Sequence, residues 1–205
     1  MCCAHSRIYS AKEKFDIVSG VASPPAFSRE VYRRRLRRQM FELFQASVLL
    51  FLSSGGSALS LLQSFSLPKI KSLTVSVLDE HYVEDTKERN FEKLKELGFL
   101  RKVVEQSHHP AFGTPPHPRR GENASFSFYG GDVKTAEKRF DAFLRSWIRE
   151  NPNGKIIATV GMGTDGHTAG IMPFYDKKSF QKLFNKKDVL AVGYKTSYGV
   201  CAERV

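Results

Sequence analysis

The sequence contains no apolar run long enough to cross a bilayer. Its longest such run, 46–52, is interrupted by Ser47, whereas a membrane-spanning helix needs about 20 residues. No basic start is followed by the apolar core of a secretion signal, so we expect a cytoplasmic protein without a membrane partner. Cysteine is scarce: Cys2, Cys3 and Cys201 are odd in number and lack the spacing of metal ligands, which fits a reducing compartment.

Acidic residues are few beside 32 Lys and Arg, and the net charge is +11. Six arginines fall within 29–38, which could indicate a surface for nucleic acid. Apolar side chains recur at helical spacing through the same segment: Tyr32, Leu36, Met40, Phe41, Leu43 and Phe44. We therefore interpret the arginines as the solvated face of an amphipathic helix that begins near Ser28, and we expect no nucleic-acid partner.

The order of the predicted elements indicates the fold class. Apolar, β-rich runs predict strands at 48–52, 73–78, 156–160 and 189–194. Helical spacing predicts helices near 59–65, 91–100, 133–150 and 176–185, and 108–131 is expected to be a long surface loop. This alternation predicts an α/β fold with a Rossmann-like, doubly wound, mostly parallel sheet and helices on both faces. We expect 1–27 to be weakly structured and 28–205 to form a single domain.

Polar residues follow three of the predicted strands. The first strand leads into Ser54, Gly55, Gly56 and Ser57, whose small side chains let backbone N–H groups face an anion. The second leads into Asp79, Glu80 and His81. Taken alone, each segment is also an ordinary turn or an exposed strand end. Because the carboxyl ends of parallel strands share one edge of a sheet, we expect these groups to line one ligand site.

The third strand is followed by the most informative segment, 161–169, which reads GMGTDGHTA. Its three glycines permit the tight backbone that delivers Asp165 and His167 to the same edge. An Asp-Gly pair is a common turn and a single histidine is often structural, but a histidine at a strand's carboxyl end can also serve as a general base. The coincidence of three such loops favours the functional interpretation.

In this order the segments resemble the 6-phosphogluconolactonase family, which is related to glucosamine-6-phosphate deaminase. The family carries Ser-Gly-Gly-Ser-Thr, then Asp-Glu-Arg, then Gly-x-Gly-x-Asp-Gly-His-Thr-Ala. The matching segments here are 54–58 (SGGSA), 79–81 (DEH) and 161–169, and the family's Ser-Asn-Tyr is echoed by 89–91 (RNF). The deaminase branch usually has glutamate before the proline that follows its Asp-Gly-His segment. Met172 precedes Pro173 here, which favours the lactonase.

The resemblance implies hydrolysis of 6-phosphogluconolactone in the pentose phosphate pathway, without a metal or an organic cofactor. His167 would activate water and Asp165 would orient its imidazole. The substrate-binding residues it implies are Ser54, Gly55, Gly56, Ser57, Asp79, Glu80, His81, Asn90, Gly163 and Arg204. Two alternatives stay open: a deaminase- or isomerase-like enzyme, and a non-catalytic relative that binds sugar phosphates.

Four features depart from the family pattern. His81 replaces an arginine, Ala58 replaces the threonine of the phosphate loop, and Arg89 replaces the serine before Asn90. A histidine cannot supply the permanent, forked charge of arginine. The fourth departure is at the end of the sequence. Arg204 resembles the start of a strand after which family members continue into a further part, which contains a phosphate-binding lysine. We therefore expect a C-terminally truncated member of the family.

Overall fold

The computed structural model describes more than half of the chain. The described residues are 15–20, 34, 38, 46–56, 59, 62–63, 65, 70–105, 124–127, 129–161, 166–172, 177–186, 188–195 and 203–204. Most of the predicted basic helix lies outside these ranges, although Arg34 and Arg38 are helical and exposed.

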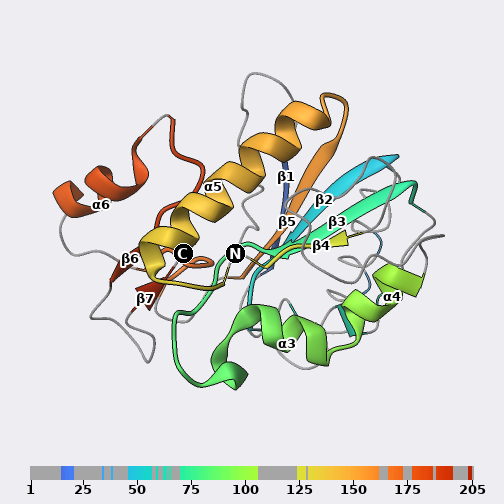
Figure 1. The fold of residues 1–205 in the computed structure, drawn as a ribbon, viewed down its shortest axis with the longest axis horizontal. Coiled ribbons are helices and arrows are strands. Elements are labelled where there is room, and N and C mark those ends of the chain that lie inside the picture. Colours follow the sequence, from blue (N-terminus) through green and yellow to red (C-terminus); the bar gives the residue numbers. More distant parts are fainter. Residues whose placement is uncertain are drawn as a thin grey trace.

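Five parallel strands form the central sheet, in the order β1-β5-β2-β3-β4. The strands are β1 (Phe15–Gly20), β2 (Val48–Ser53), β3 (Ser72–Val77), β4 (Ala124–Ser125) and β5 (Lys155–Gly161). Figure 1 shows them side by side across the middle of the molecule. The predicted parallel sheet is therefore confirmed.

The strand order reverses beside β2. From β2 the chain adds β3 and then β4 on one side, after which β5 returns to the other side of β2. Ser53, at the end of β2, pairs with Val77 of β3 and with Thr159 of β5. The carboxyl ends of these strands thus meet at a topological switch point, which is where open α/β sheets bind their ligands.

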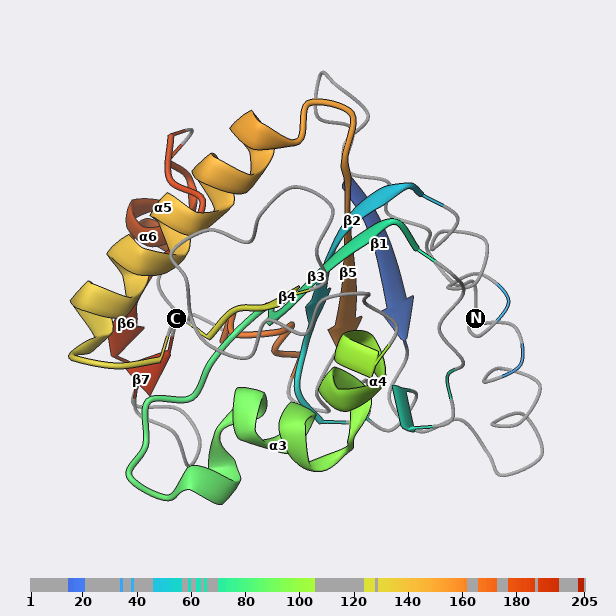
Figure 2. The same ribbon diagram turned by 45° about the vertical axis from the view of Figure 1, so that its right-hand side comes forward.

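Helices cover both faces of the sheet, as predicted. Helices α3 (Asn90–Glu96) and α4 (Phe99–Glu105) lie on one side, and α5 (Val133–Glu150) lies on the other (Figures 1 and 2). Phe51 of β2 packs against Phe99 of α4, with ring centroids 5.9 Å apart. Since side chains alternate along a strand, the neighbours of Phe51 point to the opposite face.

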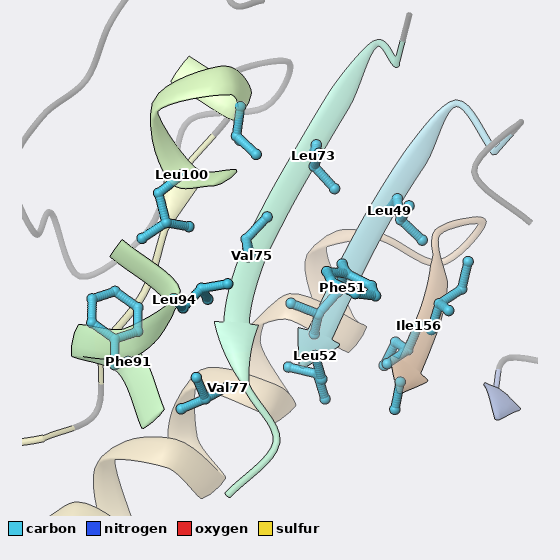
Figure 3. Close-up of a cluster of buried hydrophobic side chains, with 14 of the residues drawn as sticks. Leu49, Phe51, Leu52, Leu73, Val75, Val77, Phe91, Leu94, Leu100 and Ile156 are labelled. Atoms are coloured by element: carbon cyan, nitrogen blue, oxygen red, sulfur yellow. The ribbon is translucent and has the colours of Figure 1, made fainter. Parts of the chain in front are cut away.

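Leucine, isoleucine and phenylalanine side chains dominate the core. Figure 3 shows Phe91, Leu94 and Leu100 of the helices facing β3. The largest fully buried side chains are Phe51, Phe99, Leu49, Leu50, Leu62, Leu73, Leu94, Ile156 and Ile157. Burying each one contributes roughly 2 kcal/mol of hydrophobic stabilisation. This packed centre holds the carboxyl ends of β2, β3 and β5 in place.

Three elements differ from the sequence predictions. The segment 1–27, expected to be weakly structured, contains β1, whose backbone pairs with β5 along six residues. The helix expected over 91–100 is two helices, because Gly98 adopts a φ of +67° that ends the first one. The predicted loop 108–131 contains β4, after which the Phe126 N–H donates to the carbonyl of Val75.

The strand predicted over 189–194 is wrong. Residues 188–193 are irregular. Of the residues described in this part of the chain, Tyr194–Lys195 form a strand, β6, which pairs antiparallel with β7 (Glu203–Arg204). Carboxylates of α5 take the backbone N–H groups that a sheet would otherwise bind: Asp141 accepts from Leu190 at 2.8 Å and Glu137 accepts from Gly193 at 2.7 Å. Hydropathy alone carries no signal for such a docked segment.

Candidate functional site

Ser54 joins the ends of β2 and β5. Its N–H donates to the carbonyl and the hydroxyl of Thr159, at 3.2 and 3.3 Å, and its Oγ accepts from the Gly161 N–H at 3.0 Å. Ser54 is 2% exposed. Its side chain, predicted to contact substrate, therefore holds together the two strands between which the order reverses.

Two glycines follow Ser54 for different reasons. A Cβ on Gly55 would lie 2.3 Å from Oδ1 of Asn90, so only glycine allows the loop to approach that side chain. Gly56 has open space around it but a φ of +62°, which L-residues with a side chain rarely adopt. This loop therefore requires both glycines. Ser57, its predicted fourth member, lies outside the described residues.

Asp79 and Asn90 form a buried polar pair at the end of β3, with exposed fractions of 4% and 1%. The Asn90 Nδ2 donates to the Asp79 carbonyl at 3.0 Å and to its Oδ2 at 3.2 Å. The carbonyl oxygen and Oδ2 of Asp79 are both acceptors. The Asn90 amide must therefore present its nitrogen to Asp79 and its oxygen to Gly55. The structure thus brings Gly55, Asp79 and Asn90 together, and their contact with a substrate stays a prediction.

The Glu80 side chain binds the first backbone N–H groups of α3. Its carboxylate accepts backbone N–H bonds from Asn90 at 2.6 Å, Phe91 at 3.0 Å and His81 at 2.9 Å. The N-cap residue Arg89 makes no side-chain cap bond, so Glu80 satisfies these donors from outside the helix. Burial raises the pKa of the Glu80 carboxyl to about 7, although the three N–H donors partly oppose this. We conclude that the buried Glu80 carboxylate fixes the start of α3, and its contact with a substrate stays a prediction.

The raised pKa of Glu80 predicts that stability falls as the pH rises. The folded chain holds this proton up to about pH 7, whereas the unfolded chain releases it near pH 4.5. The stabilisation from the protonated Glu80 carboxyl is complete below pH 4.5 and is lost as the pH rises through 7. The free energy of unfolding then falls by roughly 3 kcal/mol at most. Urea unfolding between pH 4.5 and 8 measures it, with Glu80→Gln as the control. Equal pH slopes for the two proteins would contradict the prediction.

His81 and Arg89, two of the departures from the family pattern, both lie between Asp79 and Asn90 in the sequence. The His81 Nε2 is 3.9 Å from Asp79 Oδ2, close enough for an ion pair when the imidazole is protonated. The Arg89 guanidinium donates to the carbonyls of Val83 and Glu84, at 3.1 Å each, and stacks 3.9 Å from the ring centre of Tyr129. Arg89 thus holds the loop after β3.

The Asp-Gly-His segment returns to the end of β5. Thr168 and Ile171 exchange two backbone hydrogen bonds of 3.0 Å, and the Ala169 N–H donates to the Gly161 carbonyl at 3.2 Å. Gly166 and Ala169 have φ values of +88° and +51°, which shape the tight turn. His167 is half-buried on this loop. Gly163 and Asp165 lie outside the described residues, so the pairing of Asp165 with His167 stays a prediction.

The structure places the remaining predicted residue, Arg204, in β7 opposite Tyr194. Two residues of the site were not predicted from the sequence, Thr159 and Tyr194. Thr159 is a hydroxyl residue inside the apolar run 156–160, whereas nothing in the sequence pattern marks Tyr194. Within the described ranges, no group of three His, Cys, Asp or Glu side chains could hold a metal ion. Nor is any helix of that part long and apolar enough to span a membrane.

Comparisons with known proteins find similarity in structure only. No family model and no curated protein matches the sequence. A 6-phosphogluconolactonase from Thermotoga maritima superposes on 92% of this chain and 76% of its own, with 18% identity and a TM-score of 0.56. A 6-phosphogluconolactonase from Shewanella baltica OS155 superposes on 92% of this chain and 73% of its own, with 19% identity and a TM-score of 0.56. The chain therefore shares the fold of these two proteins.

Proposed function

We propose that the protein is a cytoplasmic 6-phosphogluconolactonase, which hydrolyses 6-phosphogluconolactone to 6-phosphogluconate in the pentose phosphate pathway. One observation carries the proposal: the three loops on which the family resemblance rests leave β2, β3 and β5 at one edge of the sheet. The shared fold of two 6-phosphogluconolactonases supports it independently of those motifs.

In the proposed reaction His167 is the general base. Its imidazole takes a proton from water, and the water oxygen attacks the lactone carbonyl carbon. The bond from that carbon to the ring oxygen then breaks, and the imidazolium returns the proton to the leaving oxygen. Asp165 would orient the imidazole and stabilise its charged form. Because His167 takes one proton and later returns it, the proposed hydrolysis needs no cofactor to accept or supply that proton.

Substrate binding would use the other two loops. The 54–57 loop would hold the phosphate through backbone N–H groups and the Ser57 hydroxyl, because Ser54 is buried between β2 and β5. Asp79, fixed by Asn90, would border the sugar, and the net charge of +11 would attract the anionic substrate. Gly163 would allow the backbone close to the lactone. His81 and Arg204 are the proposed cations near the phosphate.

A coupled assay tests this proposal. The lactone is generated in situ, and 6-phosphogluconate dehydrogenase reports the product against the spontaneous rate. We expect hydrolysis above that rate and no ammonia from glucosamine 6-phosphate. Ammonia release would favour the deaminase-like alternative. Binding of 6-phosphogluconate without any turnover would favour a non-catalytic relative.

A further inference from the structure

The Tyr194 hydroxyl bridges two backbone groups of the loop that carries His167. It donates to the Gly170 carbonyl at 2.6 Å and accepts from the Met172 N–H at 3.1 Å. Both residues lie within five positions of His167, and Met172 is 3% exposed. Without this hydroxyl a buried N–H would lose its acceptor, which makes the present loop conformation costly.

Tyr194 is itself held from several directions. Tyr194 is 7% exposed, and its ring meets the ring of Phe184 of α6 (Lys177–Phe184) edge-on, with centroids 5.5 Å apart. Its backbone pairs with Arg204 in β7. Figures 1 and 2 both show β6 and β7 beside the beginning of α5. The hydroxyl therefore projects from a fixed position.

Helix α5 sets that position through the residues that precede Tyr194. The Lys134 ammonium donates to the Gly193 carbonyl at 3.0 Å, and Glu137 accepts from the Gly193 N–H at 2.7 Å. A Cβ on Gly193 would lie 2.6 Å from a methyl group of Val133, so glycine permits the close approach. An unbroken series of contacts thus runs from α5 through Tyr194 to the His167 loop.

We infer that the Tyr194 hydroxyl is a positioning group, which fixes the 166–172 loop and thereby the imidazole of His167. The catalytic part of this inference rests on the proposed function, because Tyr194 acts only through His167. On its other side the turn is joined to β5 by a hydrogen bond from the Ala169 N–H to the Gly161 carbonyl at 3.2 Å. Loss of the hydroxyl removes both hydrogen bonds between the turn and Tyr194, and small displacements of a catalytic group lower turnover strongly.

Tyr194→Phe tests the inference, because it removes the hydroxyl and keeps the ring. Tyr129→Phe is the matched control, since its hydroxyl donates to the Val83 carbonyl at 3.2 Å, in the loop after β3. The readouts are amide exchange at 168–172, the His167 imidazole signal in NMR spectra, and kcat with KM for lactone hydrolysis. In Tyr194→Phe we expect exchange at Met172 to rise about tenfold, the imidazole signal to shift, and kcat to fall about tenfold with little change in KM.

Each outcome decides the inference. Unchanged exchange at Met172 would overturn the bridging geometry, and faster exchange with an unchanged kcat would overturn the positioning role. If the wild-type chain has no lactonase activity, the proposed function fails separately. The imidazole signal then decides: a shift in Tyr194→Phe but not in Tyr129→Phe supports the inference, and no shift overturns it.

Discussion

Replacing His167 with Ala is expected to reduce lactone hydrolysis to the spontaneous rate. The reaction as proposed needs a group that takes a proton from water and gives it to the ring oxygen, and Ala can do neither. General acid–base catalysis of this kind contributes about 10²- to 10⁴-fold, so a residual enzymatic rate should fall below detection. His167 is half-buried on a loop, and its loss should leave the core intact.

The coupled assay measures this effect on His167→Ala and on His109→Ala. The second variant controls for loss of an imidazole elsewhere, because His109 belongs to the Pro-rich segment predicted to be a surface loop. Urea unfolding of both variants separates lost catalysis from lost structure. Full activity in a folded His167→Ala protein would eliminate His167 as the base.

Replacing Asn90 with Asp is expected to destabilise the protein by roughly 3–5 kcal/mol near neutral pH. The change keeps the shape of the side chain but exchanges its Nδ2 donor for an oxygen. That atom lies 3.2 Å from Asp79 Oδ2, and the carboxylate of Glu80 accepts from the backbone of the same residue. Three buried carboxyl groups would then share one site, and like charges at this distance disfavour ionisation.

Urea unfolding at pH 5 and pH 8 measures this change, and the loss should be larger at pH 8. Protonation removes the repulsion at low pH, so the new carboxyl group destabilises only as the pH rises above its ordinary range. Asn185→Asp is the control, because Asn185 is exposed and the same chemical change there should alter stability by about 0.5 kcal/mol or less. Equal losses at the two positions would contradict the buried Asp79–Asn90 pair.

Periodicity predicted the elements that carry the site. The apolar runs at 48–52, 73–78 and 156–160 became β2, β3 and β5, because buried parallel strands are continuously hydrophobic. The stripe over 133–150 became α5, and Asp132 caps it through the Thr135 N–H at 2.7 Å. Parallel pairing then brought Ser54, Asp79 and Gly161 to one edge, as the sequence analysis expected.

The sequence could not predict which side chains of these loops are free to contact a ligand and which hold the loops in place. Ser54 and Glu80 have the residue types of ligand contacts, yet one joins two strands and the other binds the start of α3. Both roles depend on partners distant in the sequence or on an adjacent helix end. Tyr194 was hidden for a related reason, since its strand is only two residues long and its register depends on side chains of α5.

The most direct test compares two lactones that differ only in their phosphate. A pH-stat would record the acid released by the wild-type chain from 6-phosphogluconolactone and from unphosphorylated gluconolactone, each against its spontaneous rate. For a 6-phosphogluconolactonase we expect acceleration of the phosphorylated lactone and a much smaller effect on the unphosphorylated one. Spontaneous rates for both lactones in the presence of folded protein would contradict it.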